Sequence, residues 1–118
     1  MQWSESQDGN IVTLTLGGEI DLQYSPELRK ILQEKIKARC PVLVIEFSGV
    51  EYIDSSGLAT LVEYCRDSRA FAGALALAGL RERVRTIFDL VRLNELLTIY
   101  TTLDEAKMAI RASEKQRV

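Results

Sequence analysis

The sequence predicts a single α/β domain with a mixed, mostly parallel five-stranded sheet and about four helices. From residue 11 onward, strand-like segments alternate with helix-like segments, which indicates βαβ units with right-handed crossovers. Residues 42–47 are almost continuously apolar, as expected for a parallel strand covered on both faces. A short turn at residues 8–10 joins the first two strand-like segments, so we expect those two strands to be antiparallel.

The first two strands are expected at residues 3–7 and 11–16, the second of which is rich in β-branched side chains. Residues 17–21 are expected to form a loop that leads away from the sheet. Ser25 and Pro26 then open a helix, because serine is favoured as an N-cap and proline at the first helical position. The apolar face of this helix has helical spacing and consists of Leu28, Ile31, Leu32 and Ile36.

Cys40 and Pro41 end that helix, because a residue before proline disfavours the helical conformation. The strand at residues 42–47 follows, and Ser48 with Gly49 is expected to turn the chain. A second helix comes next, and its apolar stripe consists of Leu58, Leu61, Val62 and Cys65.

The C-terminal part of the chain continues the alternation. Residues 74–78 and 97–100 are the expected fourth and fifth strands. Between them lies a helix whose apolar face consists of Val84, Ile87, Phe88 and Val91. Thr102 and Glu105 have the spacing of a capping box, which predicts the start of a final helix.

Composition and charge limit the class of protein. The chain has 118 residues, 47% hydrophobic and 27% charged, which fits one domain spanning residues 1–118. Its net charge of -2 predicts no binding to nucleic acid. No apolar run approaches about 18 residues, and residues 1–5 lack the pattern of a signal peptide, so we expect no direct membrane insertion and a cytoplasmic location. Cys40 and Cys65 are expected to be reduced core thiols.

The sequence lacks the parts of common catalytic sites. It contains no histidine, no glycine followed by lysine and no G-x-G-x-x-G motif, which excludes the usual triads and phosphate-binding loops. We therefore expect no enzyme activity and no cofactor. Asp21 and Asp54 could together hold a magnesium ion, although two ligands are weak evidence for a metal site.

The most informative segment is Asp54, Ser55, Ser56 and Gly57, which lies between a strand-like run and a helix-like run. A hydroxyl at a helix N-terminus lies where free N–H groups and the helix dipole favour an anion. A phosphate there would add about -1.5 to -2 charges and switch the charge of one surface patch. The simpler interpretation, which is compatible with the first, is that a serine caps the helix and Asp54 is a turn residue.

The predicted topology brings a second carboxylate to the same place. Asp21 follows the strand at residues 11–16, and Asp54 follows the strand at residues 42–47. If those strands are parallel neighbours, both aspartates lie at the same carboxyl edge of the sheet, where open α/β sheets bind ligands. Tyr24 is the aromatic residue nearest to Asp21 and is a candidate contact residue, whereas Trp3 is expected to be a packing residue.

Four arginines surround the third expected helix, namely Arg81, Arg83, Arg85 and Arg92. They could contact an acidic partner or nucleic acid. We interpret them as a solvated helix face, because the net charge is negative and no aromatic residues lie among them.

These segments resemble the STAS domains of bacterial anti-sigma-factor antagonists over about residues 11–109. The resemblance is carried by residues 18–21 (GEID), 25–29 (SPELR), 42–47 (VLVIEF) and 54–58 (DSSGL), and also by residues 76–79 and 84–93. One residue departs from the pattern, because Ala59 stands where many members of the family have glycine.

The resemblance implies a partner-switching role. The unphosphorylated protein would bind an anti-sigma factor that is also a serine kinase, and so release a sigma factor for transcription. The kinase would phosphorylate Ser56, with Ser55 as the alternative acceptor, and a serine phosphatase would reset the switch. Four further residues would form the partner-binding surface with Ser55 and Tyr24: Asp21, Asp54, Gly57 and Leu58.

In that surface the resemblance gives each residue a role. Asp21 and Asp54 would shape kinase recognition, Gly57 would let the partner backbone approach, and Leu58 would begin the docking helix. A second function remains open for the same fold. The chain could be a soluble STAS subunit that regulates a membrane transporter, for example a lipid-trafficking ABC system.

Overall fold

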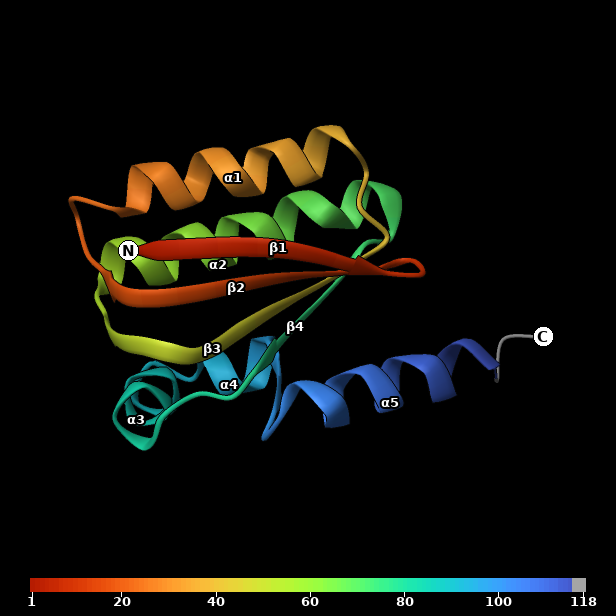
Figure 1. Cartoon of the computed structure of the whole chain (residues 1–118). Coiled ribbons are helices and arrows are strands. Elements are labelled where there is room, and N and C mark those ends of the chain that lie inside the picture. Colours follow the sequence, from red (N-terminus) through yellow and green to blue (C-terminus); the bar gives the residue numbers. More distant parts are fainter. Residues whose placement is uncertain (116–118) are drawn as a thin grey trace.

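The computed structural model describes residues 1–115, which form a five-stranded sheet with helices on both faces (Figure 1). In chain order the elements are β1 (Gln2–Asp8), β2 (Ile11–Ile20), α1 (Ser25–Lys37), β3 (Val42–Ile53), α2 (Ser55–Asp67), the 3-10 helix η1 (Ser68–Phe71), β4 (Ala74–Ala78), α3 (Glu82–Leu90), α4 (Leu93–Leu96), β5 (Thr98–Tyr100) and α5 (Leu103–Lys115). The predicted α/β fold with a mixed, mostly parallel sheet is confirmed.

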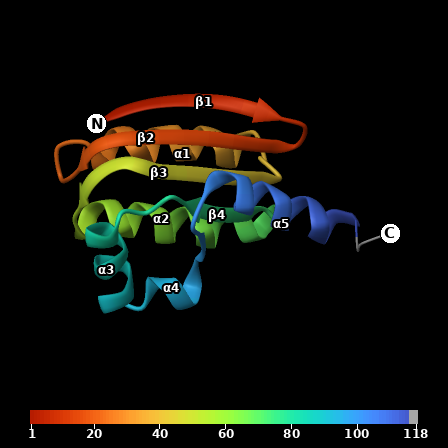
Figure 2. The same cartoon turned by 60° about the horizontal axis from the view of Figure 1, so that its bottom comes forward.

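The strands follow the chain order across the sheet, from β1 to β5. β1 is antiparallel to β2, and each of the other neighbouring pairs is parallel, as the sequence predicts. Helices α1 and α2 pack side by side on one face of the sheet, and the buried side chains of α3 join the same core cluster, while α5 packs on the other face (Figures 1 and 2). No helix within residues 1–115 is long and apolar enough to cross a membrane.

Strands β2 and β3 are longer than the sequence predicts. β2 continues to Ile20 and β3 continues to Ile53, so Ser48 and Gly49 lie inside β3 and the predicted turn there is wrong. Register shifts between the two strands absorb the extra residues. Gly49 permits the close approach, because a Cβ atom there would lie 3.1 Å from the carbonyl oxygen of Leu16.

The core has two parts, one on each face of the sheet. The larger part packs side chains of β2 and β3 against α1, α2 and α3, and the smaller part packs the other face against Ala106 of α5. Cys40 is buried as predicted, whereas Cys65 is only half-buried, and both thiols are free. Trp3 was expected to pack but is 47% exposed on β1, because no helix covers the outer edge of that strand in the described structure.

The third helical region differs from the prediction. α3 ends at Leu90, so Val91 lies beyond the helix and is exposed rather than part of its apolar face. The chain then turns at Arg92, whose φ of 61° is left-handed, into the short helix α4. The four arginines of this region are exposed on the surface, as the interpretation of a solvated face requires.

The N-terminus of α5 is capped as predicted, whereas that of α1 is not. Thr102 caps α5 as predicted, since its hydroxyl oxygen accepts a hydrogen bond from the N–H of Glu105 at 3.1 Å. The predicted N-cap at Ser25 is wrong, because Ser25 is already helical and Tyr24 occupies the cap position. The N–H groups of both residues instead donate to the backbone carbonyl of Asp21.

Candidate functional site

The parallel pairing of β2 and β3 places Asp21 and Asp54 at the same edge of the sheet. Ile20 and Ile53 are partners in the register of the two strands, and each is followed directly by an aspartate. The N–H of Asp54 donates to the carbonyl oxygen of Ile20 at 3.1 Å, which joins the two strand ends. Since neighbouring strands lie about 4.8 Å apart, the predicted common edge is confirmed.

Asp54 is the N-cap of α2. Its Oδ1 atom accepts hydrogen bonds from the backbone N–H groups of Ser56 at 2.9 Å and Gly57 at 3.2 Å. Ser55 and Ser56 therefore occupy the first turn of the helix, and the interpretation of a serine cap beside an aspartate in a turn is wrong. The reason is the length of β3, which brings the carboxylate to the cap position.

The hydroxyl of Ser56 is fixed by the same carboxylate. Its Oγ atom donates to Oδ1 of Asp54 at 2.5 Å, which is a short, charge-assisted hydrogen bond. The side chain is half-buried, whereas Ser55 beside it is exposed. The structure thus holds one of the two hydroxyls in a defined direction at the start of α2.

The environment of Asp54 lowers its pKa below the usual value for aspartate. The largest cause is the hydrogen bond from the Ser56 hydroxyl, and the backbone N–H groups of Gly57, Ser56 and Leu22 add to it against partial burial. The N–H of Leu22 belongs to the loop between β2 and α1. The carboxylate of Asp54 therefore stays ionised at neutral pH.

Removing the cap gives a testable change in stability. We expect Asp54→Ala to lower the free energy of unfolding by about 1 kcal/mol at neutral pH, because the N–H groups of Ser56 and Gly57 lose their acceptor. The folded pKa of Asp54 lies below its unfolded value, so the charge contributes above the unfolded pKa of about 3.9 and is lost as the pH falls through the folded pKa.

Urea unfolding at pH 7 and near pH 3 measures this difference. The gap between the wild-type protein and Asp54→Ala should be smaller at the lower pH. Asp54→Asn is the matched control, because asparagine also caps helices but carries no charge. A gap of equal size at both pH values would show that the carboxylate charge contributes nothing to the cap.

Asp21 organises the loop before α1. Its backbone carbonyl accepts from the N–H groups of Tyr24 at 3.1 Å and Ser25 at 2.8 Å. Its Oδ1 atom accepts from the N–H groups of Gln23 at 3.0 Å and Tyr24 at 3.2 Å. Asp21 is half-buried, so it both shapes the loop and presents negative charge at the rim, and the ring of Tyr24 is half-buried next to it.

Gly57 and Leu58 face the interior. A Cβ atom at Gly57 would lie 2.7 Å from Cγ1 of Ile53 and 2.9 Å from Cγ2 of Ile20, so only glycine lets α2 approach the two strand ends this closely. Leu58 is 8% exposed and belongs to the core. The contacts that the structure shows for these two residues are intramolecular, and their direct part in partner binding stays a prediction.

Leu22 is a candidate site residue that was not predicted from the sequence. It is 75% exposed in the loop between Asp21 and Gln23, although leucine side chains are usually buried. A second exposed apolar residue, Tyr52, lies close to the end of β3 and is 43% exposed. The exposure of Leu22 could have been predicted from the sequence, because Leu22 lies between two polar residues in a loop and does not belong to the apolar face of a predicted helix.

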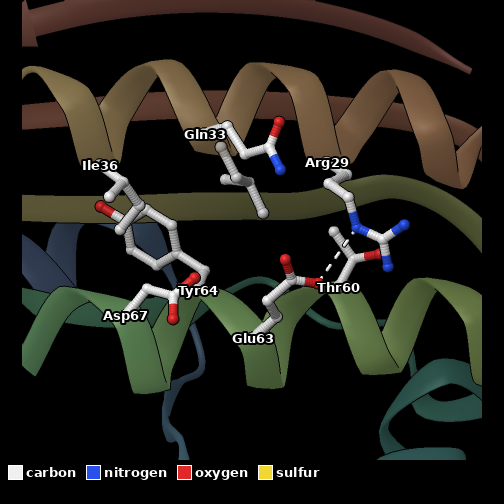
Figure 3. Close-up of a pocket in the computed structure, with 8 residues that line it drawn as sticks. Arg29, Gln33, Ile36, Thr60, Glu63, Tyr64 and Asp67 are labelled. Carbon is white, nitrogen blue, oxygen red and sulfur yellow. Dashed lines mark hydrogen bonds and ion pairs between the residues drawn. The ribbon is translucent and has the colours of Figure 1, made fainter.

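The site lies at the carboxyl edge of β2 and β3, on the surface of the molecule. A small pocket lies between α1 and α2, where Arg29 and Glu63 form an ion pair at 3.1 Å (Figure 3). Its volume of about 10 Å³ holds roughly one water molecule. Burial raises the pKa of Tyr64, which lines this space. Within residues 1–115, no three Asp, Glu, Cys or His side chains are grouped to hold a metal ion.

We call Asp21, Leu22, Asp54, Ser55 and Ser56 the switch rim. It combines two carboxylates, one fixed hydroxyl and one exposed leucine on two adjoining segments. Such a surface can contact another protein through Leu22, and its charge changes sharply if a hydroxyl is esterified with phosphate.

Comparison with known proteins gives the family. A family model described as the STAS domain matches residues 2–106. The anti-sigma-B factor antagonist of Listeria monocytogenes is 27% identical over 95 residues, which cover 80% of this chain and 83% of that protein. The protein of the same name from Bacillus subtilis is 29% identical over 93 residues, which cover 79% of this chain and 84% of that protein.

Solved structures agree with the sequence matches. An anti-sigma factor antagonist from Mycobacterium paratuberculosis matches with a TM-score of 0.86 at 25% identity, and the match covers 93% of each chain. A structure of SpoIIAA from Bacillus in its phosphorylated form has the same fold, with a TM-score of 0.73 at 21% identity over 92% of this chain and 99% of the other. Because the family model spans most of its residues, this chain belongs to the STAS domain family.

Proposed function

We propose that the chain is a phosphorylation-controlled protein-binding module that acts as an anti-sigma-factor antagonist. Its unphosphorylated form binds an anti-sigma factor with serine kinase activity and so releases a sigma factor. The single observation that carries the proposal is the Ser56 hydroxyl, which a carboxylate fixes at the N-terminus of α2. Relatives named anti-sigma-B factor antagonist support the class of partner.

In the proposed reaction, Ser56 is the phosphoacceptor. Its oxygen forms a bond to the γ-phosphorus of an ATP molecule bound by the kinase, the bond to ADP breaks, and the hydroxyl proton is released. Asp54 orients the hydroxyl through the hydrogen bond at 2.5 Å. Because its pKa is lowered, Asp54 is a weak base at neutral pH, and we assign it a positioning role rather than proton abstraction.

The phosphorylated form is expected to lose its partner without unfolding. A phosphate adds about -1.5 to -2 charges beside the carboxylates of Asp54 and Asp21. The N-terminus of α2 favours an anion, which stabilises the modified fold. A partner surface that fits the neutral hydroxyl and Leu22 meets a strongly anionic rim instead, and a serine phosphatase restores the first state.

The phosphoacceptor assignment is tested by incubating the protein with ATP and the kinase of its own host, followed by mass spectrometry of the peptides. We expect one phosphate on Ser56, full loss of labelling in Ser56→Ala and normal labelling in Ser55→Ala. The two substitutions remove the same group from adjacent residues, which makes them matched controls. Labelling that persists in Ser56→Ala and disappears in Ser55→Ala would assign the switch to the exposed serine.

A further inference from the structure

β1 is an open edge of the sheet. Within residues 1–115 it pairs with β2 only, and Figure 2 shows it as the outermost strand. All seven of its residues are exposed. The pairing with β2 runs without a bulge along the whole strand. An edge of this kind presents a row of backbone N–H and C=O groups to which another strand can pair.

The usual protections of an edge strand are missing from β1. Natural edges are protected by proline, by bulges or by charged side chains, and β1 has neither proline nor bulge. Its two charged residues are neutralised within the chain. Glu5 forms an ion pair with Lys35 of α1, and Asp8 forms ion pairs with Arg111 and Lys107 of α5.

A groove runs along this edge on the face that α1 covers. Its volume is about 420 Å³, and Trp3 and Ile31 provide its apolar lining between charged residues of α1. Trp3 is the largest apolar side chain of the strand and is 47% exposed. The edge therefore offers both unpaired backbone groups and apolar surface to an incoming strand.

We propose that β1 pairs with β1 of a second copy of this chain, in antiparallel orientation about a two-fold axis at Glu5. Away from the axis, residues of the two strands are compatible in that register, because Ser4 meets Ser6, Trp3 meets Gln7, and the Gln2 amide can donate to Asp8. The two Glu5 side chains meet at the axis, where the ion pair of each with its own Lys35 reduces their repulsion.

The pairing joins two five-stranded sheets into one continuous sheet. Because the axis is perpendicular to the sheet, both copies of α1 lie on the same face and their grooves adjoin. The switch rim remains accessible in each copy, since Ser56 follows β3 and not the edge strand. The antiparallel arrangement directs the two rims toward opposite ends of the dimer.

Sedimentation velocity of the full chain from roughly 1 to 300 μM tests whether this dimer forms. We expect the sedimentation coefficient to rise with concentration toward that of a dimer. The double substitution Ser4→Lys with Ser6→Lys places like charges opposite each other and should raise the dimer Kd about tenfold. Ser4→Thr with Ser6→Thr is the matched control and should leave the Kd unchanged. A monomer at every concentration overturns the proposal.

Cysteine crosslinking tests the register. Side chains directly opposite on antiparallel strands have Cβ atoms about 4.5–5.5 Å apart, close to disulfide geometry. Glu5→Cys should therefore form a disulfide-linked dimer under mild oxidation. Trp3→Cys and Gln7→Cys should crosslink only when the two variants are mixed. Wild-type protein gives the background from Cys40 and Cys65. Self-crosslinking of Gln7→Cys as fast as that of Glu5→Cys overturns the proposed pairing.

Discussion

Ser56→Glu is expected to weaken binding of the anti-sigma factor about a hundredfold, equivalent to about 2.7 kcal/mol. The substitution replaces a hydrogen-bond donor with a carboxylate directly beside Asp54. Two like charges about 4 Å apart repel by about 1 kcal/mol in water and about 4 kcal/mol at a partly desolvated interface. A partner that covers the rim would therefore increase the repulsion between the new carboxylate and Asp54, which weakens binding. Isothermal titration calorimetry with the purified partner measures the change.

The fold of Ser56→Glu should remain intact, because a negative charge in the first turn of a helix is favourable by about 0.3–1 kcal/mol. The melting temperature should therefore change little. Ser55→Glu is the matched control, since it adds the same charge one residue earlier on an exposed side chain, and we expect a smaller loss of affinity. Unfolding of Ser56→Glu would assign Ser56 a mainly structural role.

Leu22→Ala is expected to weaken binding of the same partner by about tenfold to a hundredfold. An exposed apolar side chain at the centre of an interface commonly contributes about 1–3 kcal/mol when a partner buries it. Leu22 is 75% exposed, so its truncation in the free protein removes few contacts and should barely alter stability. Binding measured by surface plasmon resonance should show the loss mainly in the dissociation rate.

Leu90→Ala is the matched control for this prediction. Leu90 is 78% exposed at the end of α3. Leu90→Ala therefore truncates the same type of side chain at a similarly exposed position outside the switch rim. Its affinity should equal that of the wild-type protein. Equal losses in both variants, or no loss in Leu22→Ala, would show that Leu22 does not contact the partner.

The sheet topology could be predicted from the sequence because it depends on pattern. Apolar strands that alternate with amphipathic helices require parallel pairing, and this pairing brings Asp21 and Asp54 to one edge although they are far apart in the chain. The element order and the mixed sheet follow from the same argument. The common edge of the two aspartates is therefore a consequence of topology and can be deduced from the sequence.

The ends of β2 and β3 could not be predicted in the same way. Ser48 and Gly49 have the composition of a turn, yet both lie inside β3, where a register shift places Gly49 opposite Gly17. This choice depends on contacts between strands that are distant in sequence. It also decides which residue caps α2, since both Asp54 and Ser56 are suitable caps and only the true end of β3 selects Asp54.

Exposure of single residues was the other property that local pattern did not determine. Trp3 and Leu22 are apolar and exposed, whereas Gly57 is buried because Ile20 and Ile53 close over it. Each of these depends on which segments pack next to the residue. Sequence pattern thus indicates the serine and its two acidic neighbours, but not the leucine that we expect the partner to contact.

Esterifying the Ser56 hydroxyl on the switch rim with phosphate is expected to abolish partner binding. The direct measurement is the affinity of one purified anti-sigma factor for two samples of the wild-type protein, one unphosphorylated and one fully phosphorylated on Ser56. We predict that the phosphorylated sample binds at least about a hundredfold more weakly, with unchanged secondary structure by circular dichroism. Equal affinity of the two samples would contradict the account.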